Sequence, residues 1–221
     1  MPEEPSLEFR KASAAAGLSP GARRLHLAIL TGFVEAGAPP TAEELRRIAA
    51  DHGIDVVAAT AELAERDVVV FDESGEVSAA YPFSVAPTGH RVSWQGISGR
   101  HSMCAIDALG TSAMLDRPVT VTSADPATGE AVVVEVDRDR AVWSPPTAVV
   151  YAGSTGESCC CSAERACGFV NFFATLDSIE TWLAGHPGIT GSVLDQEQAL
   201  SDAIGGFGDL MRPGAAVPPE S

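Results

Sequence analysis

The spacing of helix caps in the first third of the chain is the feature that most constrains the fold. Ser19 and Pro20 supply an N-cap followed by a proline at the first helical position. Thr41 and Glu44 have the spacing of a capping box, and Asp55 is suited to cap a further helix. With apolar residues at helical spacing after each cap, the pattern predicts helices at residues 20–36, 41–52 and 55–66. The apolar positions of the third helix are Val57, Ala61 and Leu63.

A predicted hairpin follows these helices, with strands at 68–71 and 77–81 around a turn at 72–75. Three helices and a hairpin outline a winged helix. In a DNA-binding winged helix the third helix enters the groove, but here that helix carries three acidic residues against one basic residue. These are Asp55, Glu62, Glu65 and Arg66. We therefore interpret the winged helix as a scaffold.

The charge of the whole chain supports this interpretation. The 221 residues include 14 basic and 30 acidic side chains, a formal net charge of −16. Such a surface repels polyanions, which argues against nucleic acid and anionic membranes as partners. A chain of this length buries a core without disulfide support, as one domain or two small ones.

The cysteines are the residues whose arrangement most needs an explanation. No stretch is long and apolar enough to span a bilayer, and the N-terminus lacks the pattern of a signal peptide, so we expect a cytoplasmic protein. Cytoplasmic cysteines are reduced thiols that more often serve metal binding or catalysis than cross-linking. They are Cys104, Cys159, Cys160, Cys161 and Cys167.

The remaining pattern predicts an α+β fold, in which a small mixed sheet flanked by helices follows the winged helix. A helix is expected from Cys104 to about Leu115, with strands and further helices after it. The expected strands are 119–122, 131–136, 148–151 and 168–173, and the expected helices begin at 177 or 178 and cover 195–211. The predicted units are an extension (1–19), a winged-helix-like domain (20–81), a second domain (82–212) and a flexible tail (213–221).

Cys104 and Asp107 are spaced to lie on one face at the start of the predicted helix. The helix N-terminus favours a thiolate and the carboxylate opposes it, so the pair is suited to share a proton. Spacing alone leaves a second interpretation open, in which Cys104 is a small buried apolar residue and Asp107 a first-turn acid.

Cys167 precedes an apolar strand and reaches Cys104 only if the fold brings the two segments together. Two converging thiolates suit a soft, thiophilic ion. The triplet Cys159, Cys160 and Cys161 adds soft ligands nearby, but three successive loop side chains cannot all point inward. We therefore treat the triplet as an accessory cluster.

Two other thiol sites compete with this interpretation. A structural zinc site usually shows paired Cys-x2-Cys spacings, which this chain lacks. A Cys/His hydrolase would use His101, three residues before Cys104, but no residue is placed to orient that histidine. His90 and His186 lie in turn-like segments, and we expect both to be solvated.

Taken together, these segments resemble the organomercurial (alkylmercury) lyase family. The stretch Met103-Cys-Ala-Ile-Asp-Ala-Leu109 is similar to the family's Trp-Cys-Ala-Leu-Asp motif at a helix start. The stretch Cys167-Gly-Phe-Val-Asn-Phe-Phe173, with Trp182 after it, resembles the family's second cysteine, its strand and the following helix. Residues 117–123 and 127–129 look like the strand and turn between them, so the resemblance covers about residues 20 to 210.

The chain also departs from the family pattern. Met103 stands where the motif has Trp, Gly168 where some members have a second Cys, and Asn171 where some have His. The triplet at 159–161 lies outside the pattern. These differences bear on substrate preference and on the handling of mercury.

The resemblance implies protonolysis of the carbon–mercury bond of R–Hg⁺, giving RH and Hg(II), with Cys104, Asp107 and Cys167 as catalytic residues. It implies no required cofactor, with Hg(II) a product held by these three residues and the triplet as accessory ligands. Small cytosolic thiols and a mercuric reductase are the implied partners. Two alternatives remain at this point: a soft-metal-binding or sensing protein on the same fold, and a family relative recruited to other thiol chemistry.

Overall fold

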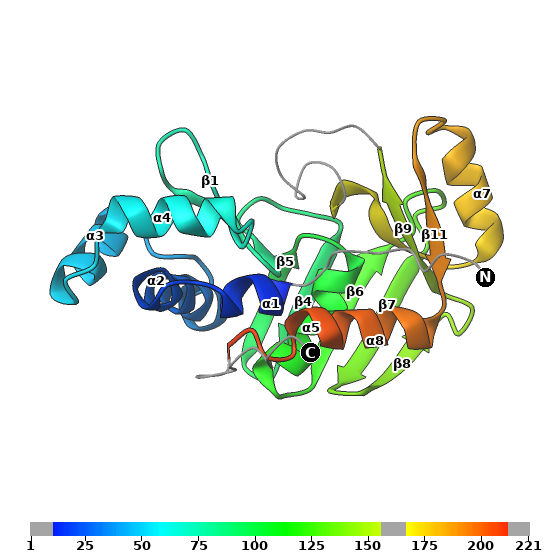
Figure 1. The fold of residues 1–221 in the computed structure, drawn as a ribbon. Coiled ribbons are helices and arrows are strands. Elements are labelled where there is room, and N and C mark those ends of the chain that lie inside the picture. The colour runs from blue at the N-terminus through cyan, green and yellow to red at the C-terminus, as the bar shows by residue number, and fades with distance from the viewer. Residues whose placement is uncertain (1–10, 156–166, 212–221) are drawn as a thin grey trace, which may run out of the picture.

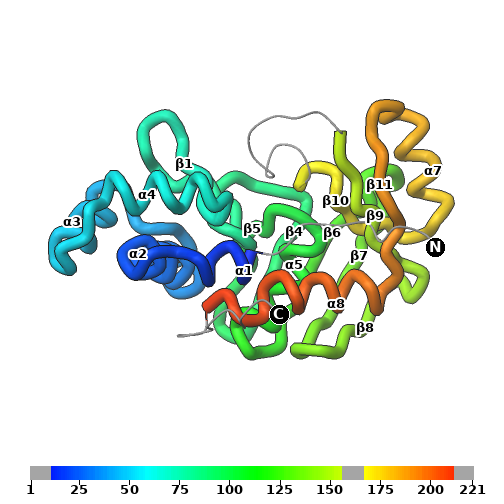
Figure 2. The backbone as a smooth tube through the Cα atoms, viewed as in Figure 1, coloured from blue at the N-terminus to red at the C-terminus, as the bar shows by residue number. Residues whose placement is uncertain are grey.

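The computed structural model describes residues 11–155 and 167–211 (Figures 1 and 2). The helices are α1 (Lys11–Ala16), α2 (Pro20–Thr31), α3 (Ala42–Asp51), α4 (Val56–Glu65), α5 (Ala105–Leu115), α7 (Leu176–Ala184) and α8 (Gln196–Phe207), with a π-helical turn η1 (Gly32–Ala36) and a 3-10 turn η2 (Cys167–Phe169). The strands are β1 (Val69–Phe71), β2 (Val77–Ala80), β3 (Phe83–Ser84), β4 (His90–Trp94), β5 (Ile97–Ser102), β6 (Val119–Ala124), β7 (Ala131–Asp137), β8 (Arg140–Ser144), β9 (Val149–Ser154), β10 (Val170–Phe173) and β11 (Thr190–Leu194).

The predicted caps of the first helices are all present. The Ser19 hydroxyl accepts from the N–H of Ala22, and Thr41 and Glu44 form the capping box. Asp55 caps α4, but the buried face of that helix differs from the predicted one. Leu63 is buried together with Ala59 rather than with Val57, which is 75% exposed. Residues four apart share a helix face, and the face of Ala59 and Leu63 is the one turned toward the core.

A single antiparallel sheet of eight strands runs through most of the molecule, in the order β1-β2-β3-β5-β4-β6-β7-β8. The hairpin β1–β2 is the predicted wing. The predicted boundary at residue 82 falls between β2 and β3, which pair directly through Ala80 and Phe83. The sheet is therefore continuous across that boundary.

Helix α5 lies in the centre of the core. It packs on β4, β5, β6 and β7 of the large sheet, on β10, and on α8, which runs beside it (Figure 2). The helices α5 and α8 approach closely because Gly110 has no side chain, and a Cβ there would collide with the ring of Phe207. A second antiparallel sheet, β10-β9-β11, lies at the far end beside α7 (Figure 1).

The α+β class is as predicted, but the main sheet is antiparallel with eight strands, not the small mixed sheet expected. The strands at 119–124, 131–137, 149–154 and 170–173 confirm the expected ones. Four strands of five or six residues, β4, β5, β8 and β11, have no counterpart in the prediction. Helix α7 begins at Leu176, earlier than expected, because Thr175 is its N-cap. Helix α8 ends at Phe207, earlier than predicted. Among the described residues, no helix has the length and apolar character needed to cross a membrane.

Candidate thiol and carboxyl site

Cys104 is the N-cap of α5, and its sulfur accepts the backbone N–H of Asp107 at 3.4 Å. The cap places the thiol and the Asp107 carboxyl side by side at the helix start, as the spacing predicts. Both residues are completely buried. The first turn of a helix carries unpaired N–H groups, so a sulfur placed here receives favourable backbone dipoles.

The fold brings Cys167 to the same point from sixty residues away. Cys167 lies in η2, immediately before β10, and β10 is held beside α5. Its sulfur is 3.9 Å from Asp107 Oδ2, and the side chain is 4% exposed. One ligand atom each from Cys104, Asp107 and Cys167 lies within 4.8 Å of the other two. The structure thus assembles the predicted trio in one buried cluster.

Burial controls the protonation of this cluster. Desolvation raises the pKa of Asp107 to about 7, against hydrogen bonding from Cys104 and the positive charge of Lys11, which lower it. The pKa of Cys104 is raised by burial first, and then by its contacts with Cys167 and Asp107. Near neutral pH the site therefore holds Cys104 as a thiol beside a carboxyl that can gain or lose a proton.

The two oxygens of Asp107 have different surroundings. Oδ2 faces the Cys167 sulfur. Oδ1 is buried and has no hydrogen-bond partner among the residues that the structure describes. Because an unsatisfied buried carboxyl oxygen is costly, this atom is positioned to hold a proton or to contact a bound ion.

Two residues beside the cluster had no place in the sequence interpretation of the site. The Tyr81 hydroxyl lies 3.7 Å from the Cys167 sulfur, and the Lys11 ammonium lies 3.7 Å from the centre of the Tyr81 ring. Tyr81 ends the predicted hairpin and Lys11 lies in the predicted extension. Neither has a spacing relationship with the cysteines, so the sequence carries no signal that would find them.

The other predicted candidates lie elsewhere. Nδ1 of His101 accepts the backbone N–H of Thr88, and His101 is not a member of the cluster. His186 is exposed, as expected. The triplet Cys159, Cys160 and Cys161 lies outside the described residues.

The expectation that His90 is solvated was wrong. His90 is 4% exposed, because it begins β4, a central strand that the sequence did not reveal. Its Nδ1 lies 3.0 Å from the Ser123 hydroxyl, and its ring packs edge-on against Phe172. Burial lowers the pKa of His90 to about 4, so this histidine is neutral at physiological pH.

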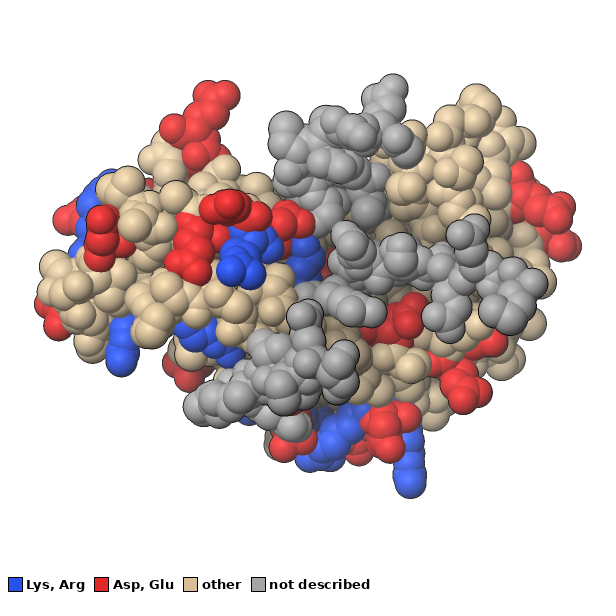
Figure 3. Space-filling view, in the orientation of Figure 1, with Lys and Arg blue, Asp and Glu red and all other residues tan. Residues whose placement is uncertain are grey.

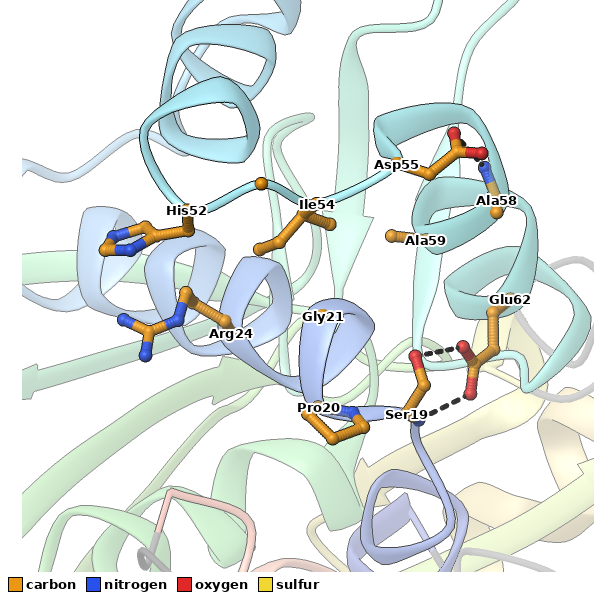
Figure 4. A pocket seen from close by; sticks show the side chains of 11 residues that line it. Ser19, Pro20, Gly21, Arg24, His52, Ile54, Asp55, Ala58, Ala59 and Glu62 are labelled. Atoms are coloured by element: carbon orange, nitrogen blue, oxygen red, sulfur yellow. Dashed lines mark hydrogen bonds between the residues drawn. The ribbon is translucent and has the colours of Figure 1, made fainter.

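The two larger cavities described for the structure lie away from Cys104 and Cys167. One, of about 470 Å³, is at the start of α2, where Glu62 accepts from both the backbone N–H and the hydroxyl of Ser19 (Figure 4). The Glu62 carboxylate therefore occupies the N-terminal end of α2. The other, of about 910 Å³, lies over β4, β6, β7 and β8. Among the described residues, no cysteine lines either cavity.

Charged side chains of both signs lie on the winged-helix lobe. On the face shown in Figure 3, acidic and basic side chains are mixed over the lobe formed by α2, α3 and α4, and acidic side chains stand at the tip of the wing. The visible face of this lobe has no continuous basic stripe, which is the electrostatic mark of a nucleic-acid interface.

Two buried thiols and a carboxyl that converge on one point are a set of ligands suited to a soft metal ion. The comparisons with known proteins agree with this class. Residues 83–205 match the family model described as alkylmercury lyase. The chain is 31% identical to an alkylmercury lyase from Staphylococcus epidermidis, over 69% of each chain. It is 32% identical to one from Streptomyces lividans, over 68% of each. The chain belongs to the alkylmercury lyase family.

A solved structure supports the fold. The crystal structure of the mercury-bound form of MerB2 matches with a TM-score of 0.73 and 22% identity, covering 92% of this chain and 98% of that one. The match extends beyond the family-model region, so it includes the winged-helix part as well as the segment with the cysteines.

Proposed function

We propose that this protein is an organomercurial lyase that cleaves the carbon–mercury bond of R–Hg⁺ by protonolysis, with Cys104, Asp107 and Cys167 as its catalytic residues. The single observation that carries the proposal is the convergence of these three side chains in a buried cluster in a chain of the alkylmercury lyase family. Mercury is the substrate's own atom, and the proposal includes no resident metal or cofactor.

The first step is attack by Cys104 on mercury. Its thiol proton moves to the Asp107 carboxylate as the sulfur–mercury bond forms, giving Cys104–S–Hg–R and a protonated Asp107. The raised pKa of Asp107 makes this transfer possible near neutral pH. Because the site is buried, the proton stays between protein groups and is not exchanged with bulk water.

The second step breaks the carbon–mercury bond. Cys167 adds its sulfur to mercury, which increases electron density on the leaving carbon and makes that carbon easier to protonate. Asp107 delivers its proton to the carbon, and the thiol proton of Cys167 replaces it through the 3.9 Å contact with Oδ2. In total, R–Hg⁺ reacts with two thiols and one carboxylate. The products are RH, a bis-thiolate Hg(II) complex and one carboxylic acid, so atoms and charge balance.

Release of Hg(II) needs further thiols, because a bis-thiolate complex dissociates slowly into water. We assign this role to small cytosolic thiols or a mercuric reductase, with the protein in the cytoplasm, where thiols stay reduced. The triplet Cys159, Cys160 and Cys161 is suited to act as an intermediate acceptor. Replacing all three by Ser should slow product release, and unchanged turnover and release would refute this role.

The central experiment incubates the purified protein with methylmercury and excess thiol, and measures methane in the headspace and Hg(II) in solution. Stoichiometric methane and Hg(II) are expected from the wild-type protein, and none from Cys104→Ala or Asp107→Asn. His186→Ala, an exposed substitution outside the cluster, is the matched control and should behave as wild type. Absence of methane, or methane production that survives Cys104→Ala, would overturn the proposal.

A further inference from the structure

Cys167 has a second neighbour besides Asp107. The hydroxyl oxygen of Tyr81 lies 3.7 Å from its sulfur, and Tyr81 is only 1% exposed. Tyr81 is held at the junction of β2 and β3 by its backbone N–H, which donates to the carbonyl of Val68. A hydroxyl accepts a hydrogen bond from a thiol and donates one to a thiolate, so this contact serves Cys167 in both states.

Lys11 lies on the other side of the same tyrosine. Its ammonium is 3.7 Å from the centre of the Tyr81 ring and 2.7 Å from both the backbone carbonyl and the carboxylate Oδ2 of Asp67. Lys11 is 5% exposed, which is costly for a cation and requires compensating contacts. The ring face and Asp67 provide them.

The position of Lys11 has an electrostatic consequence for the whole cluster. Its positive charge acts on Asp107, where it opposes the effect of burial. A cation beside the ring also strengthens a phenol as a hydrogen-bond donor, and this effect is large where water is excluded. The arrangement connects Lys11, Tyr81 and Cys167 in one series of contacts that ends at the proposed reacting sulfur.

We propose that Tyr81 and Lys11 are positioning residues for Cys167: the Tyr81 hydroxyl aligns the sulfur and donates to it as it becomes a thiolate, and Lys11 fixes the Tyr81 ring and offsets the negative charge that develops. This inference rests on the proposed function, because it assigns Tyr81 and Lys11 to the second thiol of that reaction. A purely structural role would need only the volume of the ring, which phenylalanine also supplies.

The test compares Tyr81→Phe with Tyr151→Phe. Tyr151 is also buried, but its ring packs with Phe173 and Trp182 in a separate cluster, so it controls for the loss of a buried hydroxyl. Tyr81→Phe should lower kcat for phenylmercury by roughly tenfold to a hundredfold, the effect of a lost hydrogen bond to a charged group, with KM changed less than about twofold. Tyr151→Phe should leave both constants unchanged.

A second readout does not depend on turnover. With Cys104 and the triplet 159–161 changed to Ser, Cys167 is the remaining thiol, and mercuric chloride uptake by it is followed by ultraviolet absorbance of the sulfur–mercury bond. Adding Tyr81→Phe to this background should slow uptake about tenfold. If the wild-type chain released no hydrocarbon, the proposed function would fail, and this measurement would still decide the role of Tyr81.

Substitutions of Lys11 separate charge from packing. Lys11→Met keeps much of the apolar stem and removes the charge, and should reproduce the loss of kcat seen with Tyr81→Phe. Lys11→Arg keeps the charge and should restore most of the activity. The inference is overturned if Tyr81→Phe matches Tyr151→Phe in both readouts, or if Lys11→Met turns over as fast as Lys11→Arg at equal thermal stability.

Discussion

The sulfur of Cys104 accepts the backbone N–H of Asp107, so the proposed nucleophile is also the N-cap of α5. The Cys104 sulfur thus caps the helix and, in the proposed reaction, also attacks mercury. In the proposed reaction, we expect this hydrogen bond to weaken when the sulfur binds mercury and the neighbouring carboxyl takes the thiol proton. Substitutions of Cys104 can separate helix capping from the proposed reaction.

Cys104→Ser should keep the helix cap, because a hydroxyl oxygen accepts the same N–H, whereas Cys104→Ala should remove it. We expect the Ala variant to unfold about 1 kcal/mol more easily than the Ser variant, the usual effect of a lost N-cap. Both variants should lose hydrocarbon release. Urea unfolding measures the difference, and equal stability of the two variants would show that the sulfur does not cap the helix.

Asp107 should make stability depend on pH in the neutral range. Its pKa is about 7 in the folded protein, against an ordinary aspartate value of 3.8, so the folded state binds the proton more tightly than the unfolded chain. The stability associated with this proton is complete below about pH 4 and is lost as pH rises through 7. Asp107→Asn removes this pH dependence. The free energy of unfolding of the variant, minus that of wild type, should therefore be about 3 kcal/mol larger at pH 8 than at pH 4.5. The exposed Asp51→Asn is the control and should show no such trend.

His26 should act in the opposite direction, at acid pH. Burial lowers its pKa to about 3 from 6.5, so the folded state disfavours the proton that the unfolded chain binds. The contribution of neutral His26 to the free energy of unfolding is complete above about pH 6.5 and is lost as pH falls toward 3. His26→Leu should reduce the loss of stability between pH 7 and pH 4.5 by about 3 kcal/mol. His186→Leu, at an exposed histidine, should follow the wild-type curve, and a similar response from both variants would contradict the assignment.

Asp125 connects the β6–β7 turn to the end of β10. It is 1% exposed and accepts the backbone N–H groups of Ala127, Thr128 and Ala174. Asp125→Ala leaves these donors without a partner and should lower the free energy of unfolding by about 2 to 4 kcal/mol. Asp125→Asn keeps one acceptor oxygen and should lose less. The order wild type, Asn, Ala in thermal unfolding is the expected result.

The sequence was informative wherever the determining contacts are local. Caps such as Ser19 and Asp55 satisfy helix ends within a few residues, so their patterns predict helices directly. The pairing of Cys104 with Asp107 is likewise a property of one helical turn. Cys167 could be connected to them only through the family resemblance, because the contact depends on β10 packing beside α5.

What the sequence could not provide are contacts between distant segments. Lys11 and Tyr81 are seventy positions apart in the chain, and nothing in either segment indicates that they are in contact. His90 was misjudged because its strand is short and polar, and only the pairing with β5 and β6 buries it. In both cases tertiary packing determines the environment of the side chain, and the local sequence does not indicate that environment.

The family-model match leaves out part of the continuous eight-stranded sheet, since β1 and β2 precede it. The family-model match begins at residue 83, in the middle of the pairing between Ala80 and Phe83. Phe83 is completely buried, with its ring stacked 5.5 Å from that of Phe33 in the winged helix. A fragment starting there would present an unpaired strand edge and an uncovered aromatic surface, which favours aggregation. The winged helix and the domain that follows it contribute side chains to one hydrophobic core.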